Sequence, residues 1–203
     1  VMELFSIGIG PSSSHTVGPM RAGKRFADAL ESAALSPDRL RVRLHGSLAA
    51  TGLGHGTPAA ALAGLYGWDP VTCDPVAVPV LWERLADEGE LNIRGMRLAY
   101  TDVVFEPRAR HYGHPNALTF EAYDDDGTLV RAVTYLSIGG GFIQQAGGDE
   151  VPAGVAKEPS FSTAAGLLDL CHGTSIAEVA WSEELALGRS EDAVRAGLDA
   201  IWN

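Results

Sequence analysis

The sequence is short of cysteine, of positive charge and of long apolar runs, and each shortage excludes a class of protein. Cysteine occurs twice in 203 residues, at Cys73 and Cys171, which excludes a disulfide-rich secreted scaffold and predicts two buried free thiols in a cytosolic protein. Lys and Arg number 15 against 26 Asp and Glu, and the net charge of −11 excludes nucleic acids and anionic membranes as partners. No apolar run approaches the roughly 18–20 residues of a membrane helix, and residues 1–10 lack the pattern of a signal peptide.

Hydrophobic periodicity predicts both helices and strands. Apolar residues recur at helical spacing over 19–35, and Thr57-Pro58 is typical of a helix start with a hydroxyl N-cap. In the strand predicted over 40–44, apolar and polar residues alternate, and His45 after it is expected to point outward. The remaining predictions are helices over 58–66 and 81–87, strands within 96–105, and a hairpin of strands 118–123 and 129–136.

After residue 150 the pattern is helical. Helices are expected over 163–171 and 175–187, and a third begins at Ser190 and reaches Asn203 without a C-cap residue, which predicts a truncated chain. The fold class is therefore α+β, a mixed sheet with packed helices followed by a C-terminal helical segment.

Three segments are rich in hydroxyls or glycine: Ser12–Thr16, Gly52–Thr57 and Ser137–Gly141. Bare glycine amides and serine hydroxyls suit a carboxylate, and imidazoles suit proton transfer near neutral pH. Because the segments are alike in chemistry, we expect them to meet on one face. The candidate site residues are His15 and His55 for catalysis, and Ser12, Ser13, Ser14, Thr16, Gly54, Thr57, Ser137, Gly139, Gly140 and Gly141 for substrate binding.

Other motifs are incomplete. Residues 18–25 nearly match a phosphate-binding loop, but Arg25 replaces the required hydroxyl and Pro19 removes a backbone donor. His111 and His114 form a pair without further ligands, so no metal ligand is expected in this chain. A Ser–His hydrolase that uses Ser12, Ser13 or Ser14 stays open, although the nucleophile motif G-x-S-x-G is absent.

The stretch "LFSIGIGPSSSHTVGPMRAGKRF" resembles the N-terminus of the bacterial iron–sulfur L-serine dehydratases, also called L-serine deaminases. "HGSLAATGLGHGT", "HPNALTFEAYD", "YLSIGGGFI" and "ELALGRSEDAVRAGLDAIW" resemble later blocks of the same family, so the likeness spans essentially the whole chain. It implies a serine dehydratase β domain over 1–150, similar to the allosteric serine-binding domain of some phosphoglycerate dehydrogenases. Residues 151–203 would be a linker and the first helices of a truncated catalytic α domain.

The resemblance also implies a reaction. The family converts L-serine to pyruvate and ammonia with a [4Fe–4S] cluster, whose ligands would lie in the missing C-terminal domain, so this chain alone is expected to be inactive. It assigns His55 as the base and His15 as the group that stabilises the departing hydroxyl. The implied partners are L-serine, the catalytic α domain of the same chain and a second copy in a homodimer, in the cytoplasm. The alternative is a non-catalytic serine- or anion-binding module for regulation or dimerisation.

Overall fold

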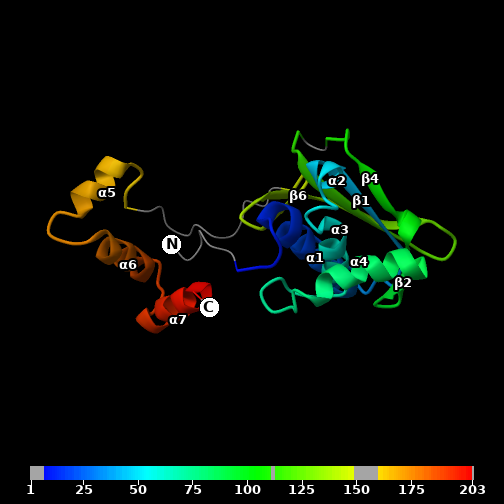
Figure 1. Cartoon of the computed structure of the whole chain (residues 1–203), viewed down its shortest axis with the longest axis horizontal. Coiled ribbons are helices and arrows are strands. Elements are labelled where there is room, and N and C mark those ends of the chain that lie inside the picture. Colours follow the sequence, from blue (N-terminus) through cyan, green and yellow to red (C-terminus); the bar gives the residue numbers. More distant parts are fainter. Residues whose placement is uncertain (1–6, 111–112, 149–159, 203) are drawn as a thin grey trace. The chain divides into compact units, whose positions relative to one another are not determined.

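The computed structural model describes residues 7–110, 113–148 and 160–202 (Figure 1). The chain forms two compact units, Gly8–Val151 and the pair of segments Val1–Ile7 and Pro152–Asn203. In the ranges that are described, no helix combines the length and the apolar character needed to cross a membrane.

The Gly8–Val151 unit is built on a seven-stranded sheet in the order β2-β3-β1-β5-β6-β7, with β4 also paired to β1. Strand β1 is parallel to β3 and β4, whereas the other neighbouring pairs are antiparallel. The sheet is therefore mixed, and the predicted α+β class is confirmed. The strands are β1 (Arg39–Gly46), β2 (Glu90–Ile93), β3 (Met96–Ala99), β4 (Val103–Glu106), β5 (Asn116–Tyr123), β6 (Leu129–Gly139) and β7 (Phe142–Gln145).

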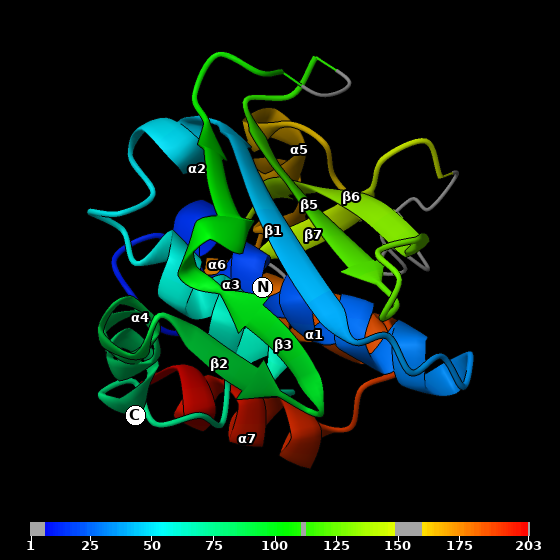
Figure 2. The same ribbon diagram turned by 90° about the vertical axis from the view of Figure 1, so that its right-hand side faces the viewer.

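Helices lie on one side of this sheet. Figure 1 shows α1, α3 and α4 on the same side of the strands, and in Figure 2 the strands β1, β3 and β5 lie in front of α1 and α3. The helical elements of the unit are η1 (Ser13–Val17), α1 (Gly18–Ser32), α2 (Ser47–Ala50), α3 (Thr57–Leu65), α4 (Ala77–Glu88) and η2 (Tyr100–Asp102).

The side chains of β1 alternate between an apolar face of the sheet, which packs on the helices, and a more polar face. Leu40, Val42 and Leu44 are almost fully buried and belong to the core between sheet and helices, as their alternation predicts. His45 is expected to point outward, but only 1% of it is exposed. Its Nδ1 lies 2.8 Å from Glu106 and its Nε2 lies 2.8 Å from the Thr119 hydroxyl, so residues of β4 and β5 enclose it. Local alternation does not reveal such cross-strand partners.

Helices α1 and α3 touch through their backbones. A Cβ atom on Gly64 would overlap the carbonyl oxygen of Met20, and one on Gly23 would lie 2.5 Å from the carbonyl oxygen of Ala61. Both glycines lie inside helices, so the close approach rather than an unusual φ requires them. The two helices run in the same direction, because residues 15–16 lie beside 55–57 and residues 20–24 beside 61–65.

The boundaries differ from the sequence prediction in several places. Helix α4 begins at Ala77 rather than at residue 81, and the elements α2, β2 and β7 are not predicted. Each of these three has only four residues, which is too few for a periodic pattern to be recognised. The hairpin of β5 and β6 and the helix over α1 are confirmed.

The C-terminal unit contains the three predicted helices, α5 (Ala164–Leu170), α6 (Ile176–Ala186) and α7 (Glu191–Trp202). Ser175 and Glu178 form a capping box at the start of α6. Val179 and Val194 are buried, and the buried carboxylate of Glu184 pairs with Arg189. Large apolar side chains such as Leu168, Ile176 and Trp202 are exposed, so these helices bury little of their apolar surface within the described residues.

Candidate functional site

The Ser12–Thr16 segment is a helical turn and not the open loop that its composition predicts. Ser12 is the N-cap of η1, a π-helical turn that continues directly into α1, and its hydroxyl accepts a hydrogen bond from the amide of His15 (3.3 Å). The predicted helix start at Pro19 is one residue after the start of α1 at Gly18, and the sequence does not predict the π-helical turn before it. A π-helical turn is wider than an α-helical one, is rare, and is frequent at functional sites. His15 lies within this turn, so the backbone of the turn sets the direction of its side chain.

Three hydroxyls tie the predicted segments together. Thr16 donates to the carbonyl of His55 (2.9 Å), Thr57 to the carbonyl of His15 (2.6 Å) and Ser137 to the carbonyl of Ser14 (2.8 Å). The prediction that the segments meet is thus confirmed. A hydroxyl has one proton, so none of these three can donate to a substrate without first breaking its bond to the backbone. All three residues are buried, which suits a structural tie.

Thr57 also corrects the predicted start of the second helix. The sequence predicts that its hydroxyl caps the helix, but the N-cap of α3 is Gly56, at φ 67°, and no side chain caps this end. Thr57 is the first helical residue, and its hydroxyl bonds to His15 instead. A glycine in the left-handed region can start the helix, which leaves the threonine for a tertiary contact.

The two candidate histidines lie side by side. Their ring centroids are 4.9 Å apart, with the ring planes at 42°. The His15 ring contacts hydroxyls at both nitrogens: Ser14 at Nδ1 (3.0 Å), and Ser47 (3.1 Å) and Thr51 (3.2 Å) at Nε2. These residues and His55 form the histidine cluster: Ser14, His15, Ser47, Thr51 and His55.

The ring of His55 is held from one side only. Its Nδ1 lies 2.9 Å from the carbonyl oxygen of Thr51, and no described residue hydrogen-bonds to its Nε2. Because a carbonyl can only accept, Nδ1 carries the proton and Nε2 of the neutral ring is a free base. Burial, with the nearby His55 ring as a second cause, lowers the pKa of His15 below its usual value. His15 therefore remains uncharged at a lower pH than a free histidine.

The glycine-rich segment after β6 packs against the start of the helix. Gly139, Gly140 and Gly141 all have positive φ (100°, 59° and 76°), so the tight β6–β7 connection needs glycine at each position. The carbonyl of Gly141 accepts a hydrogen bond from Arg21 of α1 (2.9 Å), and a Cβ on Gly141 would lie 2.6 Å from Val17. This segment contacts the same helical turn that carries His15.

Gly54 and His55 line a small pocket of about 220 Å³, together with Thr16, Val78 and Pro79 among others. Gly54 itself is exposed, and a Cβ there would meet only the carbonyl of Thr51, at 3.7 Å. The pocket combines an imidazole with mostly apolar or glycine walls. A base beside a confined space is the arrangement that proton abstraction requires.

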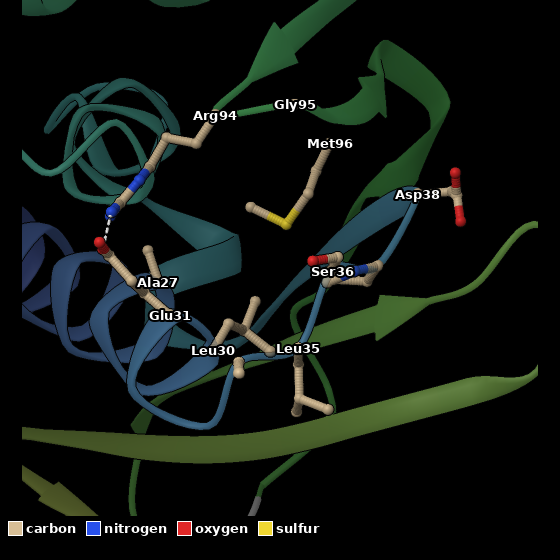
Figure 3. Close-up of a pocket in the computed structure, with 11 residues that line it drawn as sticks. Ala27, Leu30, Glu31, Leu35, Ser36, Asp38, Arg94, Gly95 and Met96 are labelled. Atoms are coloured by element: carbon tan, nitrogen blue, oxygen red, sulfur yellow. Dashed lines mark hydrogen bonds and ion pairs between the residues drawn. The ribbon is translucent and has the colours of Figure 1, made fainter.

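A larger pocket of about 680 Å³ lies at the other end of α1, next to the turn between β2 and β3 (Figure 3). Leu30, Leu35 and Met96 line it, and Arg94 is paired with Glu31 at its edge. No imidazole or thiol lines it. Acid–base chemistry therefore favours the smaller pocket beside His55 over the larger one.

Sequence reasoning missed Ser47 and Thr51. Ser47 is the first residue and Thr51 the C-cap of the four-residue helix α2, which directly follows β1, and their side chains reach His15. The available signal was two hydroxyls at i and i+4, which lie on one helical face, a few residues before the "GHGT" segment. Helix α2 itself has no histidine and only four residues, so its own pattern does not mark it as part of the site.

The described residues do not fit an iron–sulfur cluster. The chain has two cysteines, both free, with Cys73 in one compact unit and Cys171 in the other, whereas a cluster needs three or four thiolates. Over 7–110, 113–148 and 160–202, no group of three or more His, Cys, Asp or Glu is arranged to hold a metal. His111 lies outside the described residues, and Nδ1 of His114 accepts from the amide of Asn116 (3.1 Å).

Comparison with known proteins identifies the family of the chain. The model of the serine dehydratase beta chain family matches residues 1–148. The L-serine dehydratase of Streptomyces coelicolor is 44% identical, in an alignment that covers 100% of this chain and 47% of the relative. The L-serine dehydratase of Mycobacterium tuberculosis is 42% identical, over 98% of this chain and 45% of the relative. L-serine dehydratase 1 of Escherichia coli is 38% identical, over 92% of this chain and 43% of the relative. The chain thus spans less than half the length of these relatives. It belongs to the serine dehydratase beta chain family.

Proposed function

We propose that this chain is the β domain of an L-serine ammonia-lyase and that the histidine cluster forms one wall of the active site. The observation that carries the proposal is the pair of imidazoles 4.9 Å apart, beside a pocket, in a chain whose relatives are named L-serine dehydratases. The reaction removes the α-proton and the β-hydroxyl of L-serine to give aminoacrylate and water. Aminoacrylate then takes up water and yields pyruvate and ammonia.

His55 is the proposed base. The Thr51 carbonyl holds the Nδ1 proton, which leaves the lone pair of Nε2 available for the α-proton of L-serine. His15 is the proposed group that stabilises the departing hydroxyl, and for this its N–H must exchange a hydroxyl of the cluster for the substrate. Its lowered pKa keeps the ring neutral, so it does not repel the proton that His55 accepts.

The substrate is proposed to bind over the start of η1. Ser12, Ser13 and Ser14 lie there, and the hydroxyls of Ser12 and Ser14 are 3.3 Å apart. These hydroxyls suit the carboxylate of L-serine, and for Ser14 this requires that its hydrogen turns from Nδ1 of His15 to the substrate. The remaining predicted residues are proposed to shape the wall: Thr16, Thr57, Ser137, Gly54 and the glycines 139–141. The hydroxyls of Thr16, Thr57 and Ser137 are bonded to backbone carbonyls, so they hold the wall together and do not bind the substrate.

The second wall and the [4Fe–4S] cluster are proposed to belong to the remainder of the full-length protein, the catalytic α domain. When bound, such a cluster supplies a Lewis-acidic iron for the substrate hydroxyl. The present chain, with two cysteines, should bind no cluster and deaminate no serine. Stoichiometric iron in the 203-residue chain after anaerobic reconstitution would contradict this. The homodimer and the cytoplasmic location stay predictions.

The kinetic test uses a protein of the relatives' full length that contains this chain. His55→Ala should lower kcat by about 10²-fold or more, the usual effect of removing a positioned proton-transfer group. His15→Ala should also lower kcat, and both variants should keep their iron, since neither residue is a proposed cluster ligand. If His55→Ala keeps the original turnover, or loses its iron, His55 is not the base.

The alternative is a binding module that holds serine or another anion without chemistry. Such a module needs hydrogen-bond donors but gives no reason for two imidazoles to converge, so the 4.9 Å separation favours catalysis. A Ser–His hydrolase built on Ser14 and His15 is disfavoured, because Nε2 of His15 contacts hydroxyls where such enzymes have a carboxylate.

A further inference from the structure

Thr51 contacts both histidines through different atoms. Its backbone carbonyl oxygen lies 2.9 Å from Nδ1 of His55, and its hydroxyl oxygen lies 3.2 Å from Nε2 of His15. The same hydroxyl donates to the carbonyl of Ser47, one helical turn earlier (3.0 Å). One residue at the end of α2 therefore contributes an acceptor to each imidazole.

Counting protons determines the direction of these bonds. The carbonyl of Thr51 can only accept, so Nδ1 of His55 must carry a hydrogen. The hydroxyl of Thr51 has one hydrogen, and this is already donated to Ser47. Toward His15 it can therefore only accept, which requires a hydrogen on Nε2 of His15. In the neutral ring Nδ1 of His15 is then unprotonated and accepts from the hydroxyl of Ser14.

We propose that Thr51 is a positioning residue that holds His15 and His55 in opposite tautomers, Nε2–H in His15 and Nδ1–H in His55. The catalytic meaning of this arrangement rests on the proposed function: the basic nitrogen of His55 is its free Nε2, whereas the basic nitrogen of His15 polarises Ser14. Thr51 thus makes a different nitrogen basic in each of the two neutral imidazoles.

The tautomers are measured directly on the 203-residue chain by two-bond ¹H–¹⁵N correlation of the imidazoles at a pH where both rings are neutral. Thr51→Val keeps the shape and the carbonyl but removes the hydroxyl. We expect the tautomer ratio of His15 to move by about fivefold toward Nδ1–H, the effect of losing one hydrogen bond, while His55 stays Nδ1–H. Thr51→Ser restores the hydroxyl and should restore the original ratio.

Ser47→Ala is the matched control, because the Ser47 hydroxyl also contacts Nε2 of His15 (3.1 Å) but has no other hydrogen bond within the described residues. Its hydrogen is therefore free, and it can accept from Nε2–H or donate to an unprotonated Nε2, so it favours neither tautomer. It should leave both tautomers as they are. The inference is overturned if His55 is Nε2–H in the unsubstituted chain, if Thr51→Val leaves His15 unchanged, or if Ser47→Ala alone produces the shift. Thr51→Ala serves as a second variant with the same expectation should the valine disturb folding.

These outcomes are separate from the test of the proposed function. If the tautomers are as stated but His55→Ala keeps full turnover in the full-length protein, the positioning by Thr51 stands and the proposed base is wrong. If turnover is lost in His55→Ala but Thr51→Val leaves the tautomers unchanged, the base stands and Thr51 does not set it.

Discussion

His45 and the histidine cluster are close in sequence but opposite in environment. His45 is 1% exposed and has a carboxylate at Nδ1, from Glu106, and a hydroxyl at Nε2, from Thr119. His15 and His55 are half-exposed, and their partners among the described residues are hydroxyls, a carbonyl and each other. A carboxylate favours a charged imidazolium, whereas neutral partners leave a base. A buried histidine paired with a carboxylate fits a structural role, whereas two neutral imidazoles beside a pocket support the proposed proton transfer.

The largest expected effect is on stability and tests the structural role of His45. His45→Ala removes the partner of Glu106 and Thr119 at the junction of β1, β4 and β5. Glu106 keeps Arg43 and Thr119 keeps Thr134, but each loses one partner and the removed imidazole leaves a cavity, so the free energy of unfolding should fall by about 3 kcal/mol. Chemical denaturation followed by circular dichroism measures this on the 203-residue chain. His55→Ala is the control and should change stability by less than about 0.5 kcal/mol; equal losses in both variants would remove the distinction.

A second variant leaves every histidine in place and disturbs the helices that lead away from the cluster. Gly64→Ala would place a Cβ against the carbonyl of Met20, so α1 and α3 must move apart, at a cost of about 2 kcal/mol. Gly54→Ala is the matched control, because a Cβ there has room. Denaturation gives the stabilities, and the imidazole shifts of His15 and His55 should change together in Gly64→Ala only. Unchanged shifts would mean that the crossing of α1 and α3 does not fix the cluster.

The smallest expected effect concerns pH. The pKa of His15 is lowered from 6.5 in the folded chain, so the unfolded chain binds a proton there at higher pH. Stability should therefore fall as the pH drops through about 6.5 toward the lower folded pKa, and this part should vanish in His15→Gln. Solvent screening of the half-exposed ring makes the effect smaller than the two above. Denaturation of both proteins at several pH values measures it, and identical slopes would contradict the shift.

Local patterns were sufficient for much of the fold. The alternation in 40–44 predicted β1, the turn at 124–127 predicted the hairpin, and helical spacing predicted α1 and the three C-terminal helices. These elements are long enough for a period to repeat, which is what a sequence pattern records. Parallel pairing of β1 with β3 and β4 joins distant segments and leaves no local signal.

The candidate site was predicted in its parts but not in its connections. Composition identified the segments of His15 and His55, because hydroxyls and glycines are concentrated there. It did not reveal the π-helical turn, whose residues resemble a loop, or the reach of Thr51 and Ser47 to His15. Which hydroxyl is bonded to a carbonyl and which is free for a ligand depends on tertiary contacts, and composition does not record them.

The contact between Gly23 and Gly64 has a consequence for how the site is prepared. Helices α1 and α3 run in the same direction from the two histidines, and their backbones touch about two turns further along. The two helices are therefore packed as one unit with both imidazoles at one end. The spacing of the two rings is then set when the chain folds. In the proposed function, the entropy lost in aligning the two imidazoles is therefore incurred once, during folding, and not again with each substrate molecule.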